Sequence, residues 1–169
     1  MKITMNNNRT HKKIKVAETS DYFFIELCAK EYIDLIKNFK KKFENNDFFI
    51  LIGYYENNVA GVLVSERNNV VKSIKDILPA IQIHFVYVNP AFRGKKIGHN
   101  LLNEFVNIKK RNNIALIFVE LFKNNKKGMK FFEKFGFQKV KIDAAKVILT
   151  KNIWDDLGIS SQEFFDIFT

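Results

Sequence analysis

The chain has 169 residues, of which 47% are hydrophobic and 27% charged, so it is long enough to bury a sizeable core and is typical of one globular domain rather than a disordered chain. Its net charge of +10 favours an anionic partner, which charge alone leaves open as nucleic acid, an anionic membrane or a phosphorylated cofactor. The single cysteine, Cys28, excludes an internal disulfide and thiolate metal clusters, and no apolar run is long enough to span a bilayer.

The N-terminal part of the chain predicts a strand followed by helical structure. Residues 13–17 are β-rich, and residues 18–21 offer capping side chains for a helical region over residues 22–43, which reads as one helix or two. Apolar side chains suggest its helical surfaces: Phe23, Phe24, Leu27, Leu35, Ile36 and Phe39. We expect Cys28 at a buried helix position rather than as a reactive thiol. Because no apolar run follows the positive start of the chain, we expect no secretory signal and a cytoplasmic location.

The middle of the chain predicts a hairpin, a third strand and a helix. Residues 48–55 and 59–65 are β-rich runs, and the Glu56-Asn57-Asn58 segment between them favours a tight turn. Residues 81–88 form another strand, which Asn89-Pro90 closes. A helix begins near Gly98, and its apolar residues recur at helical spacing: Leu101, Leu102, Phe105 and Ile108.

The C-terminal part completes the expected sheet. Residues 114–122 form a strand, and residues 127–135 form a short helix that Gly136 ends. Two further strands cover residues 137–142 and 146–150. The order predicts an α/β fold with a mixed, mostly antiparallel sheet of six to seven strands flanked by about four helices. We expect one domain over residues 1–151, with residues 152–169 as an amphipathic helical tail packed on it.

The segment with the clearest chemical signal follows the strand at residues 81–88. Arg93-Gly94-Lys95-Lys96-Ile97-Gly98 leads into the amphipathic helix. Free backbone N–H groups at a helix N-terminus bind anions, and the dipole of the helix favours negative charge there. Glycines allow a phosphate to approach the backbone closely, and the basic side chains add positive charge. The pattern therefore predicts a phosphate-binding turn.

This segment resembles the acyl-CoA signature of the GNAT (N-acetyltransferase) superfamily, R/Q-x-x-G-x-G/A. Arg93, Ile97 and Gly98 match, as does the V-x-N-P sequence upstream, whereas Lys96 replaces the usual glycine. A second block, residues 119–137, is similar to the family's stretch in which a strand ends at Asn and a helix closes with Y-E-K-x-G-F. The residues that fit this block are Asn125, Glu133, Lys134, Gly136 and Phe137.

The resemblance implies an N-acetyltransferase that uses acetyl-CoA as cosubstrate. It acts on a primary amine of a small molecule, a polyamine, a protein N-terminus or a lysine, by direct attack in a ternary complex. Asn125 is expected to bond the pantetheine or the diphosphate. The full set of residues that the resemblance places at the cofactor is Val86, Tyr87, Val88, Arg93, Gly94, Lys95, Lys96, Ile97, Gly98, His99, Asn125 and Phe132.

The amine must lose a proton, so a general base is expected. Glu120 is the first candidate, because it occupies the strand position where ribosomal-protein N-terminal acetyltransferases of this superfamily place a glutamate. His84 is the second, since it lies on the strand that faces the acetyl group and its type has a suitable pKa. The neighbouring Gln82 has no titratable group. Each candidate also has a non-catalytic explanation. Glu120 can be an ordinary exposed strand residue or pair with a lysine, and His84 can be a packed structural side chain.

Phe132 departs from the family, since it stands where the usual tyrosine protonates the departing thiolate. Tyr87 or water is a substitute donor, although Tyr87 is also explained by packing. Phe132 and Lys96 both differ from the family pattern, so an alternative function stays open. In that alternative the chain is a catalytically degenerate acyl-CoA-binding domain that acts as a sensor or scaffold. A nucleic-acid-binding domain is motivated by charge alone, and we expect neither nucleic acid nor membrane as partner.

The acceptor site and the assembly are less specified by the sequence. Side chains that can line the acceptor site are Tyr22, Glu31, Tyr32 and Asp34, whose acidic members would favour a cationic amine. We expect a monomer or a homodimer. His11 and His99 lie too far apart in sequence for a recognisable metal-ligand spacing, so no metal is predicted.

Overall fold

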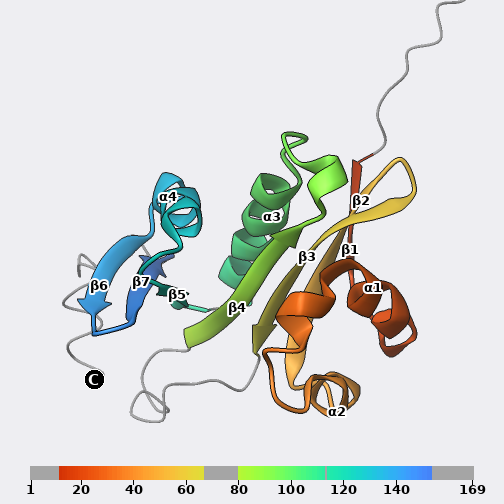
Figure 1. The fold of residues 1–169 in the computed structure, drawn as a ribbon, viewed down its shortest axis with the longest axis horizontal. Coiled ribbons are helices and arrows are strands. Elements are labelled where there is room, and N and C mark those ends of the chain that lie inside the picture. Colours follow the sequence, from red (N-terminus) through yellow and green to blue (C-terminus); the bar gives the residue numbers. More distant parts are fainter. Residues whose placement is uncertain (1–11, 67–79, 113, 154–169) are drawn as a thin grey trace, which may run out of the picture.

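The structure is a computed structural model that describes residues 12–66, 80–112 and 114–153. Its elements follow the expected order, and they form a single α/β domain built on one mixed sheet (Figure 1). The expected tail over residues 152–169 lies outside the described residues from position 154 onward. In the described part, no helix combines the length and the apolar character that crossing a membrane requires.

The N-terminal elements are β1 (Lys12–Val16), α1 (Tyr22–Ile33) and α2 (Phe39–Glu44), with a short 3-10 turn, η1 (Thr19–Asp21), before α1. The helical region thus divides into two helices. Its buried face is formed by Ile25, Ala29, Ile33, Phe39 and Phe43.

The expected helical surfaces of this region are only partly correct. Phe39 is buried, but Phe23, Phe24, Leu27 and Leu35 are exposed. Cys28 is only partly buried. Burial raises the pKa of its thiol to about 11, so the thiol stays protonated and unreactive at neutral pH.

The central strands are β2 (Phe48–Tyr55), β3 (Asn58–Glu66) and β4 (Ala80–Val88). Glu56 and Asn57 have φ angles of 47° and 67° in the turn between β2 and β3. Two consecutive positive φ angles are the geometry of a two-residue turn that matches the twist of the paired strands. The predicted hairpin is therefore confirmed.

The remaining elements are η2 (Pro90–Phe92), α3 (Ile97–Arg111), β5 (Leu116–Phe122), α4 (Lys126–Lys134), β6 (Gln138–Ile142) and β7 (Lys146–Asn152). Gly136 follows α4 with a φ of 84°, as expected for a C-terminal glycine. The sheet has seven strands in the order β1-β2-β3-β4-β5-β7-β6. All neighbours pair antiparallel except β4 and β5, which run parallel.

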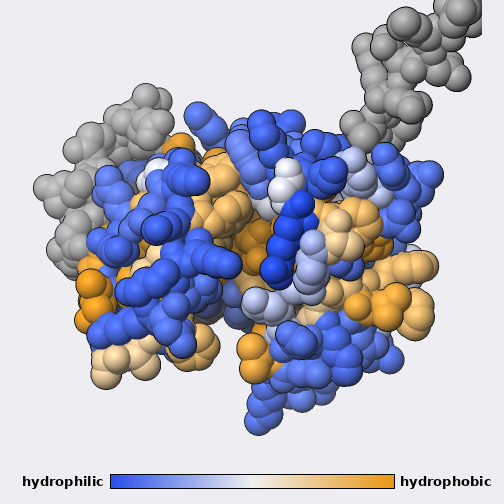
Figure 2. Space-filling model, turned by 45° about the horizontal axis from the view of Figure 1, so that its top comes forward, coloured by the Kyte–Doolittle hydropathy of each residue, from blue (hydrophilic) through white to orange (hydrophobic). Residues whose placement is uncertain are grey.

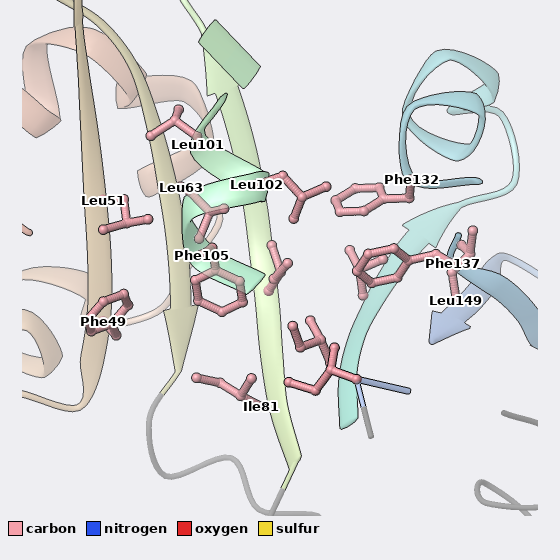
Figure 3. Close-up of a cluster of buried hydrophobic side chains, with 14 of the residues drawn as sticks. Phe49, Leu51, Leu63, Ile81, Leu101, Leu102, Phe105, Phe132, Phe137 and Leu149 are labelled. Carbon is pink, nitrogen blue, oxygen red and sulfur yellow. The ribbon is translucent and has the colours of Figure 1, made fainter. Parts of the chain in front are cut away.

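Two apolar clusters cover the two faces of the sheet. One joins α1 and α2 to residues such as Ile50, Val64 and Phe85. The other joins α3 and α4 to residues such as Leu63 and Ile83. In Figure 3, Phe132 reaches from α4 towards Leu102 of α3, so the second cluster ties these two helices together. Each helix pair is therefore fixed to its own side of the sheet.

The strands β4 and β5 separate at their carboxyl ends. Their parallel pairing runs from Ala80 opposite Leu116 to Ile83 opposite Val119, and no later pair of residues in these two strands is hydrogen-bonded across this edge in the described part of the chain. Backbone N–H groups of β4 beyond this point are consequently available to a ligand. The gap in the sheet is where the candidate residues gather.

Candidate active site

A cavity of about 770 Å³ occupies the region where β4 and β5 separate. Its walls include residues from both faces of the sheet, with Tyr32 and Phe85 on the α1 side and Gly98 and Phe132 on the side of α3 and α4. Figure 2 shows hydrophobic side chains at the bottom of a hollow in a largely hydrophilic face. We name this space the central cavity. Most of the predicted site residues line it: His84, Val86, Tyr87, Val88, Arg93, Gly98, Glu120, Asn125 and Phe132.

A second, smaller cavity of about 320 Å³ lies at the N-terminus of α3. It shares Val88, Arg93 and Gly98 with the central cavity, and it adds other predicted cradle residues: Gly94, Lys96, Ile97 and His99. Lys95 lines neither space, because its ammonium lies over the Tyr55 ring, 5.6 Å from the centroid. We name this second space the cradle, and it is continuous in its residues with the central cavity.

The backbone of the cradle fits an anionic ligand. Gly94 has a φ of 76°, and a Cβ there would meet no atom within 4 Å, so the space above it is open. Lys96 has a φ of 61°, which places a non-glycine residue in the left-handed region at the N-cap of α3. This is the position where the resembled family has glycine. Lysine keeps the same N–H group there at a conformational cost of about 1–2 kcal/mol.

Gly98, in the first turn of α3, is held close to neighbouring elements. A Cβ at this position would approach Val88 Cγ2 to 3.3 Å and the Phe131 ring to 3.5 Å. The backbone of α3 therefore lies against β4 and α4 at the entrance of the cavity. The free N–H groups of the first helical turn face a space bordered by the exposed Arg93 side chain.

His84 occupies a β-bulge. In the pairing of β3 with β4, Val64 lies opposite Phe85 and Ser65 opposite Ile83, so His84 is the extra residue. The bulge directs both His84 and Phe85 towards the α1 and α2 side, where His84 stacks edge-on against Phe48 at 5.6 Å. His84 lines the central cavity from there.

Glu66 holds the His84 ring, and the sequence pattern did not identify it. His84 Nε2 lies 2.7 Å from a Glu66 carboxylate oxygen, and Lys42 Nζ donates to the other oxygen at 3.1 Å. Burial alone would raise the pKa of Glu66, but the hydrogen bonds and charges of His84 and Lys42 outweigh it and lower the pKa below its usual value. The carboxylate favours the tautomer with the proton on Nε2, which leaves a lone pair on Nδ1.

Glu120 lies on β5 at the wall of the central cavity, as expected. Its carboxylate pairs with Lys146 of β7 at 3.3 Å, and both side chains are partly exposed. An exposed ion pair of this kind contributes little stability. Glu120 therefore keeps a carboxylate at the cavity without being fixed in the core.

Phe132 and Tyr87 approach the cavity from opposite faces of the sheet. Phe132 is 3% exposed and packs edge-on against Phe131 and Phe137. Its phenyl ring has no polar atom to offer to a ligand. Tyr87 lies 5.2 Å from the Tyr32 ring. Burial, the largest cause, and the nearby Cys28 raise the pKa of Tyr87, so its phenol is protonated at neutral pH and able to donate.

Asn125 lies at the exit of β5, as predicted. Its side-chain oxygen accepts from the Gly128 N–H at 2.9 Å and caps α4. A Cβ at Gly128 would come within 2.6 Å of the Asn125 amide nitrogen, which explains the glycine there. Asn125 therefore fixes the start of α4 beside the cavity.

Two of the four suggested acceptor residues line the central cavity. Glu31 and Tyr32 do, whereas Tyr22 and Asp34 border a separate, shallow space beside α2. His11 lies outside the described residues. Among the described side chains, no group of three His, Cys, Asp or Glu residues is arranged to hold a metal ion.

The chain is similar to known acetyltransferases. The model of the acetyltransferase (GNAT) family matches residues 14–137. No curated protein matches the sequence. Among solved structures, PaiA N-acetyltransferase from Thermoplasma acidophilum, in complex with coenzyme A, is 19% identical, with a TM-score of 0.66 over 84% of this chain and 99% of that one.

Two further structures share the fold. The ribosomal-protein-S18-alanine N-acetyltransferase from Escherichia coli is 15% identical, with a TM-score of 0.64 over 85% of this chain and 94% of that one. A GNAT family acetyltransferase from Elizabethkingia anophelis with acetyl-CoA bound is 14% identical, with a TM-score of 0.62 over 83% and 97% of the two chains. At these identities the likeness establishes the fold.

Proposed function

Because the chain belongs to the acetyltransferase (GNAT) family, we propose that it transfers an acetyl group from acetyl-CoA to a primary amine by direct attack in a ternary complex. The observation that carries the proposal is the meeting of two features. A basic cradle at the N-terminus of α3 shares Val88, Arg93 and Gly98 with a cavity that passes between β4 and β5. Such an arrangement holds an anionic cofactor on one side of the sheet and leaves room for an acceptor on the other.

The cradle residues hold the diphosphate of the cofactor. The N–H groups of the first turn of α3 donate to it, and Arg93 supplies charge at the rim. The N–H groups of Val86 and Val88, on the edge of β4 that β5 leaves, bind the pantetheine and polarise the thioester carbonyl. When bound, acetyl-CoA supplies a thioester whose carbonyl carbon is attacked by the amine, so that a C–N bond forms as the C–S bond breaks.

Glu120 acts as the base that accepts the proton of the amine. Its carboxylate lies at the cavity wall, paired with Lys146 and open to solvent, so a proton that it accepts passes readily to water. His84 is the second candidate, with Glu66 orienting its ring. Either residue removes the proton that prevents nucleophilic attack at neutral pH.

The alternative function is an acyl-CoA-binding domain without transferase activity. Phe132 favours it, because the ring is buried among aromatic side chains and offers no proton to the leaving sulfur. A thiol with a pKa near 8.5 is nevertheless an acceptable leaving group, and Tyr87 lines the same cavity with a protonated phenol. Transfer therefore remains the better-supported function.

Calorimetry with acetyl-CoA tests the cradle. Gly98→Glu places a carboxylate in the anion site and should weaken binding more than tenfold, since like charges repel by several kcal/mol at close range. That variant also crowds Val88, so Arg93→Glu, at an exposed position, is the second variant.

Arg111→Glu is the matched control for Arg93→Glu. It makes the same change of charge at the other end of α3, where Arg111 is exposed. We expect it to bind acetyl-CoA nearly as the unchanged protein does. Equal affinity of the Arg93 and Arg111 variants, both folded, would refute the cradle assignment.

A further inference from the structure

The central cavity has two chemically different ends. Arg93, Asn125 and Lys127 line the end beside α3 and α4, which suits the anionic cofactor. The other end lies on the α1 side of the sheet, because its residues Tyr32 and Tyr87 pack against each other there. We call this second part the acceptor end.

The acceptor end is predominantly apolar and aromatic. The Tyr32 ring lies tilted against the rings of Phe85 and Tyr87, at centroid distances of 5.3 and 5.2 Å. Leu35, in the turn after α1, and Phe122, at the end of β5, border it, and their side chains are 78% and 59% exposed. Large apolar side chains left in water beside a cavity are typical of a ligand-binding surface rather than of a core.

The acceptor end carries two carboxylates and few other charges; Lys146 pairs with Glu120 at 3.3 Å, and its ammonium lies 5.7 Å from the centroid of the Phe122 ring. Glu31 lies on the α1 side and Glu120 on β5, and both line the cavity. They offset the repulsion that a chain of net charge +10 exerts on a cationic amine. A polyamine would need carboxylates spaced along its length, whereas the described lining beyond these two consists largely of apolar and aromatic side chains.

We propose that the acceptor is a primary amine carried on an apolar aromatic body, an arylalkylamine. This inference rests on the proposed function and specifies its substrate class. The amine lies near Glu120, and the ring packs between the Tyr32 side and Phe122. The apolar surroundings also favour the neutral, nucleophilic form of the amine over the ammonium ion.

The test compares primary amines that differ in the body attached to the amino group. Release of the CoA thiol is followed with 2-phenylethylamine, tryptamine, ethanolamine and spermidine, and kcat/KM is measured for each. Burying one phenyl ring should favour 2-phenylethylamine over ethanolamine by about tenfold or more. A short peptide beginning with Phe forms a further arm, which distinguishes a free amine from a peptide N-terminus as the source of the same chemistry.

Two matched variants locate the effect. Leu35→Ser should reduce the preference for 2-phenylethylamine several-fold without changing acetyl-CoA affinity, because Leu35 lines only the acceptor end. Leu27→Ser is the control: Leu27 is 73% exposed on the same helical region and lies outside the cavity lining, so its removal should leave the preference unchanged.

The outcomes separate this inference from the proposed function. If thiol release depends on an amine but kcat/KM for ethanolamine or spermidine equals or exceeds that for 2-phenylethylamine, the substrate class is overturned. The proposed transferase activity would then still stand. An equal loss of preference in the Leu35 and Leu27 variants would also overturn the substrate class. Acetyl-CoA binding with no accepted amine would overturn the transferase and the substrate class together, whereas loss of acetyl-CoA binding itself would contradict the cradle.

Discussion

At the scale of single residues, the site departs from its family at two positions that have different consequences. Lys96 keeps the backbone geometry of the cradle, because it adopts the left-handed conformation that a glycine would adopt. The strain of this conformation lowers the stability of the fold, but the backbone N–H groups stay in place. Under the proposed function, Phe132 changes the chemistry instead, since a buried phenyl ring stands where a tyrosine would donate a proton.

Replacing Phe132 with Tyr should raise turnover, because the added hydroxyl would donate to the departing sulfur. General acid catalysis is typically worth about 100-fold or more, and imperfect geometry in this packed position should keep the gain below that. Steady-state kcat with one accepted amine measures it. Phe131→Tyr is the control, since it adds the same hydroxyl one residue earlier, on another cavity-lining ring.

A second variant decides between donors. If Tyr87 already protonates the thiolate, Tyr87→Phe lowers kcat sharply and Phe132→Tyr brings no gain. That pair of results would refute the missing-donor interpretation. A neutral Tyr87→Phe beside an improved Phe132→Tyr would support it.

At the scale of secondary-structure elements, the bulge in β4 links three segments that are distant in sequence. Glu66 of β3 accepts from both His84 of β4 and Lys42 of α2. The link was not predictable from the sequence, because neither strand register nor an extra residue in one strand is visible in an apolar pattern. The cradle was predictable because its residues are adjacent in the sequence and form a motif. Glu66 became identifiable only once the pairing of β3 with β4 was known.

Glu66→Gln should destabilise the fold most at neutral pH. The pKa of Glu66 is lower in the folded chain than its unfolded value of about 4.3, so its contribution is full above that pKa and is lost as the pH falls through the folded pKa. We expect Glu66→Gln to lower the free energy of unfolding by about 1–3 kcal/mol at pH 7 and by less at pH 3, as measured by urea unfolding.

The surface pair of Glu133 and Lys139, 3.0 Å apart, offers the control for this experiment. Glu133→Gln removes the same charge from an exposed pair and should cost less than about 1 kcal/mol. If Glu66→Gln costs no more than Glu133→Gln at pH 7, the contact with His84 contributes no more than a surface pair does.

At the scale of the whole molecule, most of the fold was predictable, because alternation, turn residues and two motif blocks agree along the chain. The hairpin at Glu56-Asn57 and the glycine after α4 are confirmed at their expected positions. The faces of α1 were not predictable: apolar side chains occur on several sides of the helix, and only packing on the sheet shows that Ile25 is buried while Phe23 and Leu27 are exposed. The acceptor end is likewise assembled from distant segments, so its chemistry emerges only in the folded chain.

The overall architecture puts the proposed cofactor site and the proposed acceptor site on opposite faces of one sheet, joined where β4 and β5 separate. Glu120 lies at that junction, so its substitution tests the account as a whole. Glu104→Gln, on α3 and outside the lining of the central cavity, is a suitable control for the same loss of charge.

The most direct measurement is amine-dependent release of the CoA thiol, with the acetylated amine quantified by mass spectrometry, for the unchanged protein and for Glu120→Gln. An acetyltransferase releases equal amounts of thiol and acetylated amine. We expect Glu120→Gln to lower kcat by about 100-fold or more at unchanged acetyl-CoA affinity, while Glu104→Gln has no effect. Unchanged turnover in Glu120→Gln would transfer the role of base to His84. Acetyl-CoA binding without thiol release for any amine would contradict the central claim and leave an acyl-CoA-binding domain.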